Sequence, residues 1–347
     1  MSSRRELPEP TNVLIVKPSS LGDVISAIPV LRGLRRSFPS CRVSWMVTPG
    51  CRDVLEGQGL DEIIPFDRKR FGRIGRSVSA TGEFVRFCQA LRGRRFDWVL
   101  DLQGLFRSGF LSFVSGAAVR AGFSSARELA GVFYTHRFTV SSRHTIDRNI
   151  ELARFLGIDA RAEDLRLDIP AAWADYASQT MAQHGLTRRG FAVFSPGTRW
   201  ANKAYPVGHW RRLIGLLGGR LGVVLIGAPN ERALCGQVAQ GLSGVVDLSG
   251  QTSVGQVAAL MAQAAAVVCS DSSANFIAPS VGTPFVTLLG PTRPERTGPY
   301  GQLGKALAAN VPCLGCLRRS CPHATCMQMI EPERVLAAMQ RVMASQP

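Results

Sequence analysis

The amino-acid sequence predicts an α/β protein built from two domains with parallel sheets. Short apolar runs recur between amphipathic stretches along the chain, which is the pattern of repeated βαβ units. A chain of 347 residues is long for one hydrophobic core and suits two domains of roughly 150 to 180 residues each. The sequence has no repeat or low-complexity tract, so we expect an ordinary globular protein.

The apolar runs fall into two groups, which set the predicted domains. Between the groups, residues 170–189 carry one helix-like segment, so we place the first domain at residues 1–178 and the second at residues 179–330. The runs expected to form strands are 12–16, 42–47, 98–102, 191–194, 223–226, 245–248, 266–269 and 285–289.

A C-terminal helix is predicted over residues 331–347. Glu331 and Pro332 mark its first turn, and the residues that follow form an apolar stripe at helical spacing. The stripe consists of Val335, Leu336, Met339, Val342 and Met343. We expect this helix to cross back to the first domain, as a terminal helix often does in two-domain proteins.

The chain is strongly basic, with a formal net charge of +16. Such a field attracts anionic lipid, phosphorylated saccharide or nucleic acid, and charge alone also fits a plain role in solubility. Nucleic acid is disfavoured, because the four Tyr and five Trp are scattered and no reading helix is recognisable. Residues 1–10 contain no apolar core of a signal peptide, so we expect a cytoplasmic protein.

The first predicted strand runs into a small-residue loop that ends in a carboxylate. Ser19, Ser20 and Gly22 allow close approach of a ligand to the backbone, and Asp23 lies at the start of the following helix. Ligands of open α/β sheets bind beyond the carboxyl ends of the strands. Asp23 is therefore a candidate for catalysis, and capping of the helix is its alternative role.

Several sequence blocks together resemble the ADP-heptose:lipopolysaccharide heptosyltransferases, glycosyltransferase family nine. The likeness spans nearly the whole chain and is especially close to the enzymes that add the first inner-core heptose. The blocks, in order, are NVLIVKPSSLGDVISAIPVL, DLQGLFRSGFL, SARELAGVFY, VFSPGTRWANKAYPVGHWRRLIGLL, GAPNE, SDSSANFIA and LLGPTRPERTGPYG. The resemblance implies the GT-B architecture, with two Rossmann-like domains facing a central cleft.

The resemblance also implies a reaction. Heptose would pass from ADP-heptose to the Kdo residue of the lipid A inner core by an inverting, direct displacement without a catalytic metal. Asp23 would act as general base on the acceptor hydroxyl, a role worth about 10²–10⁴ in rate. Lys203 would neutralise charge on the departing nucleotide, whereas a solvated surface lysine is the alternative.

The second domain carries the residues that the resemblance assigns to the donor. Glu231 would hold the ribose hydroxyls, although it also suits the start of a helix, and residues 271–275 offer free N–H groups to a diphosphate. Ser273 and Phe276 depart from the glycine and histidine usual in the family, which leaves the donor sugar less determined. The expected donor residues are Gly197, Thr198, Arg199, Glu231, Thr252, Asp271, Ser272, Ser273 and Gly298.

The acceptor is expected to be an anionic glycolipid at the cytoplasmic surface of the inner membrane. Arginine matches its carboxylates and phosphates, and a solvated basic loop is the alternative. The residues expected to bind it are Ser19, Ser20, Gly22, Arg70, Arg107 and Arg127.

Four of the nine cysteines lie close together in the predicted second domain. Cys313, Cys316, Cys321 and Cys326 form a knuckle over residues 313–326. Four thiolates at this spacing suit a structural zinc or iron ion, with free thiols or disulfides as alternatives.

Two other functions remain open. The chain could be a family member that uses another nucleotide sugar or another acceptor, including protein. It could instead be a non-catalytic relative that binds a nucleotide sugar, with Ser273 and Phe276 marking lost activity.

Overall fold

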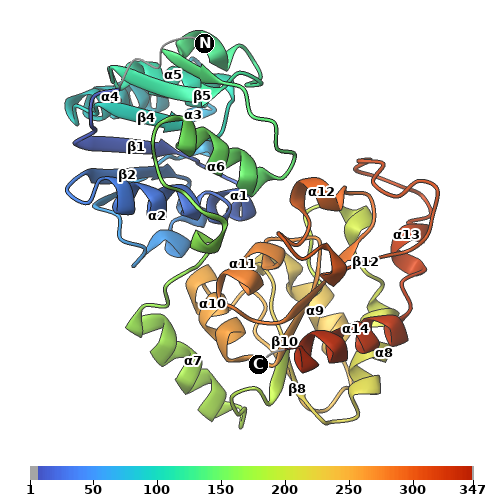
Figure 1. The fold of residues 1–347 in the computed structure, drawn as a ribbon. Helices are drawn as coiled ribbons and strands as arrows, with labels where there is room; N and C mark the ends of the chain where they lie inside the picture. Colours follow the sequence, from blue (N-terminus) through green and yellow to red (C-terminus); the bar gives the residue numbers. More distant parts are fainter. Residues whose placement is uncertain (1–6, 346–347) are drawn as a thin grey trace. The chain divides into compact units, whose positions relative to one another are not determined.

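The computed structural model describes residues 7–345, which divide into two compact units, residues 7–165 and residues 166–345. Each unit is an α/β domain with its own parallel sheet (Figure 1). Residues 1–6 and 346–347, the outer ends of the predicted first domain and C-terminal helix, lie outside the described part.

The first domain contains a six-stranded parallel sheet in the order β3-β2-β1-β4-β5-β6. The strands are β1 (Asn12–Val16), β2 (Arg42–Val47), β3 (Glu62–Pro65), β4 (Trp98–Asp101), β5 (Val119–Phe123) and β6 (His136–Phe138). The α-helices are α1 (Leu21–Ile25), α2 (Ile28–Ser37), α3 (Arg68–Phe71), α4 (Val78–Gly93), α5 (Phe106–Val114) and α6 (Thr145–Phe155). The strand order reverses between β1 and β4, and such a switch point is where open α/β sheets bind ligands.

The second domain repeats this topology, with the sheet order β12-β11-β10-β7-β8-β9 and its switch point between β7 and β10. The strands are β7 (Phe191–Ser195), β8 (Gly222–Leu225), β9 (Val245–Asp247), β10 (Ala266–Ser270), β11 (Phe285–Leu289) and β12 (Ala306–Ala308). The α-helices are α7 (Ala171–Gln183), α8 (Val207–Leu217), α9 (Arg232–Ala239), α10 (Val254–Gln263), α11 (Ala274–Ser280), α12 (Pro294–Thr297), α13 (Thr325–Gln328) and α14 (Pro332–Ala344). Each strand predicted from an apolar run is present, with bounds within one residue of those expected.

The boundary between the units falls earlier than predicted, after Leu165 rather than after residue 178. The reason is helix α7, which packs against α10 of the second domain. The ring of Trp173 on α7 fills the space beside Gly255 on α10, where a Cβ atom would overlap the indole. Packing therefore assigns α7 to the second domain, although it precedes the first strand of that domain.

The expectation that the C-terminal helix crosses back to the first domain is wrong. Helix α14 packs against α8 and against strands β10 and β11, all within the second domain (Figure 1). Its apolar stripe is the cause, because Val335, Met339 and Val342 are buried in the core cluster of that sheet. No helix within residues 7–345 has the length and apolar character needed to cross a bilayer.

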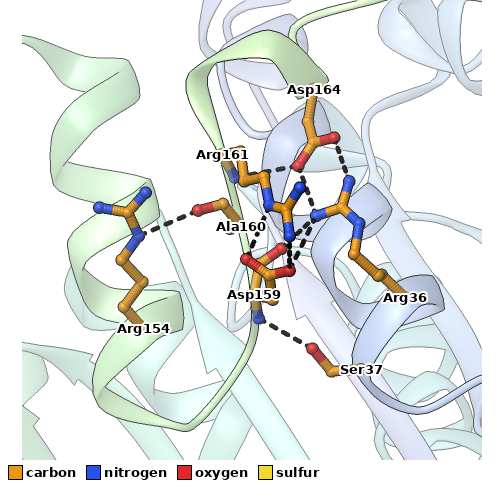
Figure 2. Close-up of polar contacts among 7 residues, drawn as sticks. All are labelled: Arg36, Ser37, Arg154, Asp159, Ala160, Arg161 and Asp164. Atoms are coloured by element: carbon orange, nitrogen blue, oxygen red, sulfur yellow. Dashed lines mark hydrogen bonds and ion pairs between the residues drawn. The ribbon is translucent and has the colours of Figure 1, made fainter.

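A polar network fixes the last segment of the first domain to helix α2 (Figure 2). The guanidinium of Arg36 contacts the carboxylates of both Asp159 and Asp164, and Arg161 pairs with Asp159 at 2.5 Å. The backbone N–H of Asp159 also donates to the Ser37 hydroxyl at 2.8 Å. Apart from the Asp164 side chain, these groups are at least one-third exposed, so each pair stabilises the fold only slightly, but together they define the path of the chain before the second domain.

Candidate active site

The switch point of the first sheet holds a buried lysine that the sequence did not single out. Lys17 directly follows β1, and its Nζ atom donates to the carbonyl oxygen of Leu102, directly after β4, at 2.6 Å. Lys17 is only 5% exposed, and this burial lowers the pKa of its amine. The nearby carboxylates of Asp23 and Asp101 act in the opposite direction. Lys17 thus joins the two loops at the carboxyl ends of β1 and β4.

Asp23 lies in the first turn of α1 and caps it. Its Oδ2 atom accepts from the backbone N–H of Ser20 at 3.0 Å and from the Ser20 hydroxyl at 2.7 Å. The half-buried carboxylate therefore performs the capping role considered as an alternative. Both bonds reach the same oxygen, so the cap does not use Oδ1, and capping is compatible with proton transfer.

A second carboxylate, Asp101, fixes the loop after β4. It is fully buried and accepts from the hydroxyls of Tyr134 and Ser108 at 2.6 and 2.7 Å, and from the N–H groups of Gln103 and Gly104 at 2.9 and 3.1 Å. Burial raises the pKa of Asp101, and these hydrogen bonds oppose the shift. All four bonds serve the shape of the loop, so we assign Asp101 a structural role.

The switch point of the second sheet joins Lys203 to Asp271. The Lys203 Nζ atom lies 2.8 Å from Oδ2 of Asp271, and the hydroxyl of Thr292 donates to the same oxygen. Thr198 donates its hydroxyl to the Asp271 carbonyl oxygen at 3.3 Å, and Lys203 lies over the ring of Trp200 at 4.4 Å. Three predicted residues are therefore in one network, and Thr292 is a member that the sequence analysis missed.

Glu231 lies against the backbone of Gly197, so two further predicted donor residues meet. A Cβ atom on Gly197 would overlap the Glu231 carboxylate, so only glycine leaves room for it. Glu231 accepts from the N–H of Ala228 at 2.7 Å, which closes the turn before α9. Glu231 therefore stabilises the start of α9 and also lies beside Gly197, another residue predicted to bind the donor.

Two predicted donor hydroxyls are buried without a partner among the described residues, namely Ser272 Oγ and Thr252 Oγ1. An unpaired buried hydroxyl costs free energy, on the order of 1–3 kcal/mol, so such atoms often mark ligand positions. Gly298 follows α12, and a Cβ atom there would lie 2.5 Å from the Pro294 carbonyl oxygen. Asn275 links α11 to that segment by donating to the Thr297 carbonyl oxygen at 2.8 Å.

Several predicted residues are placed less distinctively. Arg199 follows β7 in the same loop as Thr198, and Ser273 and Phe276 are half-buried at the start of α11. Among the acceptor candidates, Arg70 forms an ion pair with Glu83. Arg107 and Arg127 are exposed, and the N–H of Arg127 donates to the Gly104 carbonyl oxygen at 2.9 Å. Ser19, Ser20 and Gly22 lie where β1 meets α1.

The four clustered cysteines are neighbours but do not form a closed site. Burial raises the pKa of the Cys326 thiol, and proximity to Cys313, Cys316 and Cys321 raises it further. Within residues 7–345, no three His, Cys, Asp or Glu side chains are arranged to hold a metal ion. The donor atoms suit zinc or iron, whereas their arrangement in this structure does not.

The cysteine segment is attached to the loops of the second switch point. Asn202 donates its side-chain amide to the Arg318 carbonyl oxygen at 2.7 Å, and Arg319 lies over the Trp200 ring at 5.5 Å. The N–H of Leu317 donates to the Pro291 carbonyl oxygen at 2.7 Å, next to Thr292.

Comparison with known proteins identifies the family. Residues 84–326, more than half of the chain, match the model of glycosyltransferase family 9 (heptosyltransferase). The chain is 31% identical over 345 residues to lipopolysaccharide heptosyltransferase 1 of Pseudomonas aeruginosa, a match that covers 95% of this chain and 91% of the relative. The chain belongs to glycosyltransferase family 9.

Other members of glycosyltransferase family 9 agree with this assignment. The Escherichia coli K12 lipopolysaccharide heptosyltransferase 1 is 32% identical over 303 residues, which cover 84% of this chain and 91% of the relative. The solved structure of E. coli heptosyltransferase WaaC with ADP has a TM-score of 0.76 and 26% identity, and covers 95% of this chain and 99% of that one. The predicted GT-B fold class is confirmed, and the protein is a nucleotide-sugar-dependent glycosyltransferase.

Proposed function

We propose that this enzyme transfers heptose from ADP-heptose to the Kdo residue of the lipid A inner core. Relatives of nearly full length are named lipopolysaccharide heptosyltransferase 1, and solved WaaC structures contain ADP and ADP-2-deoxy-2-fluoro heptose. The observation that carries the proposal is the second switch point, where the Lys203–Asp271 pair lies among the residues expected to bind a nucleotide diphosphate.

The reaction is a single displacement at the anomeric carbon. The oxygen of the acceptor hydroxyl forms a bond to the anomeric carbon of the heptose while Asp23 takes the hydroxyl proton. The bond from the anomeric carbon to the β-phosphate oxygen of the donor breaks. ADP leaves with the electron pair, and the product has the inverted configuration. We assign proton transfer to Oδ1 of Asp23, because both capping hydrogen bonds from Ser20 reach Oδ2.

The donor side supplies charge and hydrogen bonds. Lys203 opposes the negative charge that develops on the diphosphate, and its pairing with Asp271 and stacking on Trp200 hold the ammonium in place before the donor arrives. Ser272 and Thr252 offer hydroxyls that lack partners within the described residues. Glu231 binds the ribose hydroxyls as a carboxylate acceptor.

Calorimetric titration with ADP, UDP and GDP tests the donor half of the proposal. We expect ADP to bind at least about tenfold more tightly than the other two, since the donor carries that nucleotide. Preference for UDP or GDP would favour the alternative in which the enzyme uses another nucleotide sugar. Absence of binding to all three would refute the donor assignment.

The structural zinc or iron ion at the four-cysteine cluster stays a prediction, and it requires the thiols to come closer together than they lie in this structure. Metal analysis of protein purified without chelators tests it, with one equivalent of zinc or iron as the expected result. A second readout is thiol labelling at pH 8. Cys313 and Cys316 are exposed, so they should react quickly when free and slowly while they ligate a metal. Buried Cys235 and Cys269, with pKa values raised to about 11 and about 12, should stay unreactive either way.

We place the enzyme in the cytoplasm, at the inner-membrane surface, because both substrates of the proposed reaction meet there. Support comes from the net charge of +16, which favours contact with anionic lipid. Arg107 and Arg127 are the exposed residues near the first switch point that we assign to the anionic acceptor.

A further inference from the structure

The first domain carries an exposed apolar surface on α5, on the 3-10 helix Ala130–Phe133 that follows it, and on the residue directly before that 3-10 helix. Four large apolar side chains are strongly exposed there: Phe106 at 48%, Phe113 at 53%, Leu129 at 75% and Val132 at 70%. We call these four residues the α5 patch. Isolated exposed apolar residues are ordinary, but a group of four on two packed elements marks an interaction surface.

The patch is rigid. The ring of Phe133, at the end of the 3-10 helix, packs against α5, with its centroid 5.3 Å from that of Phe106 and 6.1 Å from that of Phe113. Helix α5 approaches the 3-10 helix closely at Gly109, where a Cβ atom would lie 2.8 Å from the Ala130 carbonyl oxygen. The exposed side chains are therefore displayed on a fixed base rather than on a loose loop.

The backbone turns the apolar side chains outward at a conformational cost. Glu128 and Leu129 have φ angles of 55° and 61°, in the left-handed region that residues with a Cβ atom rarely adopt. Two such residues in succession present Leu129 to solvent. Strain kept in a loop that exposes a leucine indicates a function for that exposure.

Arginines surround the patch. Arg107 and Arg127 are exposed, as is Arg137, whose side chain lies beside Gly131. Arg120 lies over the Phe113 ring at 5.6 Å and donates to the Phe133 carbonyl oxygen at 2.8 Å. With Glu128 as the one acidic residue among residues 102–140, four arginines leave a charge of 4 − 1 = +3.

We propose that the α5 patch docks this domain on an anionic phospholipid bilayer. The apolar side chains enter the boundary between headgroups and acyl chains, and Arg137 binds lipid phosphates. Arg107 and Arg127, which we assign to the acceptor, add positive charge beside the patch. An aqueous small molecule would need a cavity and polar partners, whereas exposed apolar side chains rimmed by positive charge suit a bilayer surface. Presentation of the lipid acceptor by this contact rests on the proposed function, but binding to lipid does not.

Flotation with vesicles tests the proposal on the full-length protein. We expect binding to vesicles of phosphatidylethanolamine and phosphatidylglycerol, and much weaker binding when phosphatidylcholine replaces the anionic lipid. The double variant Leu129→Ser/Val132→Ser should lower the affinity about tenfold or more, because two exposed apolar side chains lose their burial in the boundary. Arg137→Gln should lower the affinity for anionic vesicles less than the double variant does. High salt should reduce the effect of this substitution, because salt screens the charge of the arginine. The matched control is Met329→Ser, which removes an apolar side chain 49% exposed in the second domain.

Three results would overturn the proposal. Vesicle affinity of the double variant could equal that of the wild type, or the wild type could bind neutral and anionic vesicles equally or not at all. The double variant could also retain vesicle binding but lose transfer to a water-soluble, deacylated acceptor. That outcome would place the patch in the acceptor site. Failure of transfer with intact vesicle binding in the wild type would instead count against the proposed function alone.

Discussion

Lys203 and Asp271 form an ion pair of 2.8 Å at the switch point of the second sheet, where the Asp271 oxygen also accepts from Thr292. The two residues come from loops that follow β7 and β10, so the topology brings them together across 68 positions of sequence, 271 − 203. The pair fixes the direction of the ammonium group, which we assign to the diphosphate of the donor.

Replacement of Lys203 by alanine should impair both donor binding and turnover. We expect the affinity for ADP to fall roughly tenfold and kcat to fall about 10²-fold or more, since charge on the leaving group loses its counterion. Calorimetry and initial rates measure the two effects. Lys203→Arg is the control that keeps the charge, and it should retain part of the activity. Wild-type values for Lys203→Ala would remove this residue from the site.

Asp23→Asn should separate the two roles of this residue. The amide oxygen of asparagine can still accept from Ser20, so the melting temperature should change little. Turnover should fall about 10²-fold or more, because an amide cannot take the proton of the acceptor hydroxyl. Affinity for ADP should not change, since the donor residues lie in the second domain. Near-normal turnover of this variant would refute the assignment of Asp23 as the base.

Gly197→Ala should weaken nucleotide binding without unfolding the protein. Its Cβ atom would overlap the Glu231 carboxylate, which must then leave the position that we assign to binding of the ribose. We expect the Kd for ADP to rise roughly tenfold, measured by calorimetry. The matched control is Gly208→Ala in the exposed first turn of α8, where a Cβ atom meets nothing within 4 Å. Equal affinities of the two variants would argue against the role of Glu231.

The buried amine of Lys17 should make stability depend on alkaline pH. Its pKa lies below its ordinary value of 10.5 in the folded protein, so between the two values the unfolded chain binds more protons. Stability contributed by this group therefore rises as pH increases toward 10.5. The free energy of unfolding of wild type minus that of Lys17→Met should increase over this range. A flat or decreasing difference, measured by urea denaturation, would contradict the placement of Lys17.

The sequence was most informative where burial is complete. Strands such as β1 and β7 are apolar on both faces because helices cover them, and their bounds were predicted closely. Strands β3, β5, β6 and β12 were missed. Arg120 and Gly122 interrupt β5, and Gly122 leaves space for the Tyr134 ring, which lies 12 positions further along, 134 − 122. The reason for a glycine in this strand is clear only from the structure, which shows the Tyr134 ring packed against Gly122.

The candidate site was predicted in part for a related reason. Asp23, Lys203, Glu231 and Asp271 stand in recognisable blocks, and the structure brings the last three into ordered loops of one domain. Lys17 and Thr292 could not be singled out, because their partners, Leu102 and Asp271, are distant in sequence. A lysine that directly follows a strand is usually exposed to solvent, and only the structure shows that Lys17 is buried.

The most direct measurement is transfer from ADP-heptose to a Kdo-containing lipid A precursor, with the product analysed by mass spectrometry and the anomeric configuration by NMR. The account predicts a product heavier by one heptose, with the configuration at the anomeric carbon inverted relative to the donor, and release of one ADP per transfer. Release of ADP without a glycosylated Kdo, or a product with retained configuration, would contradict it.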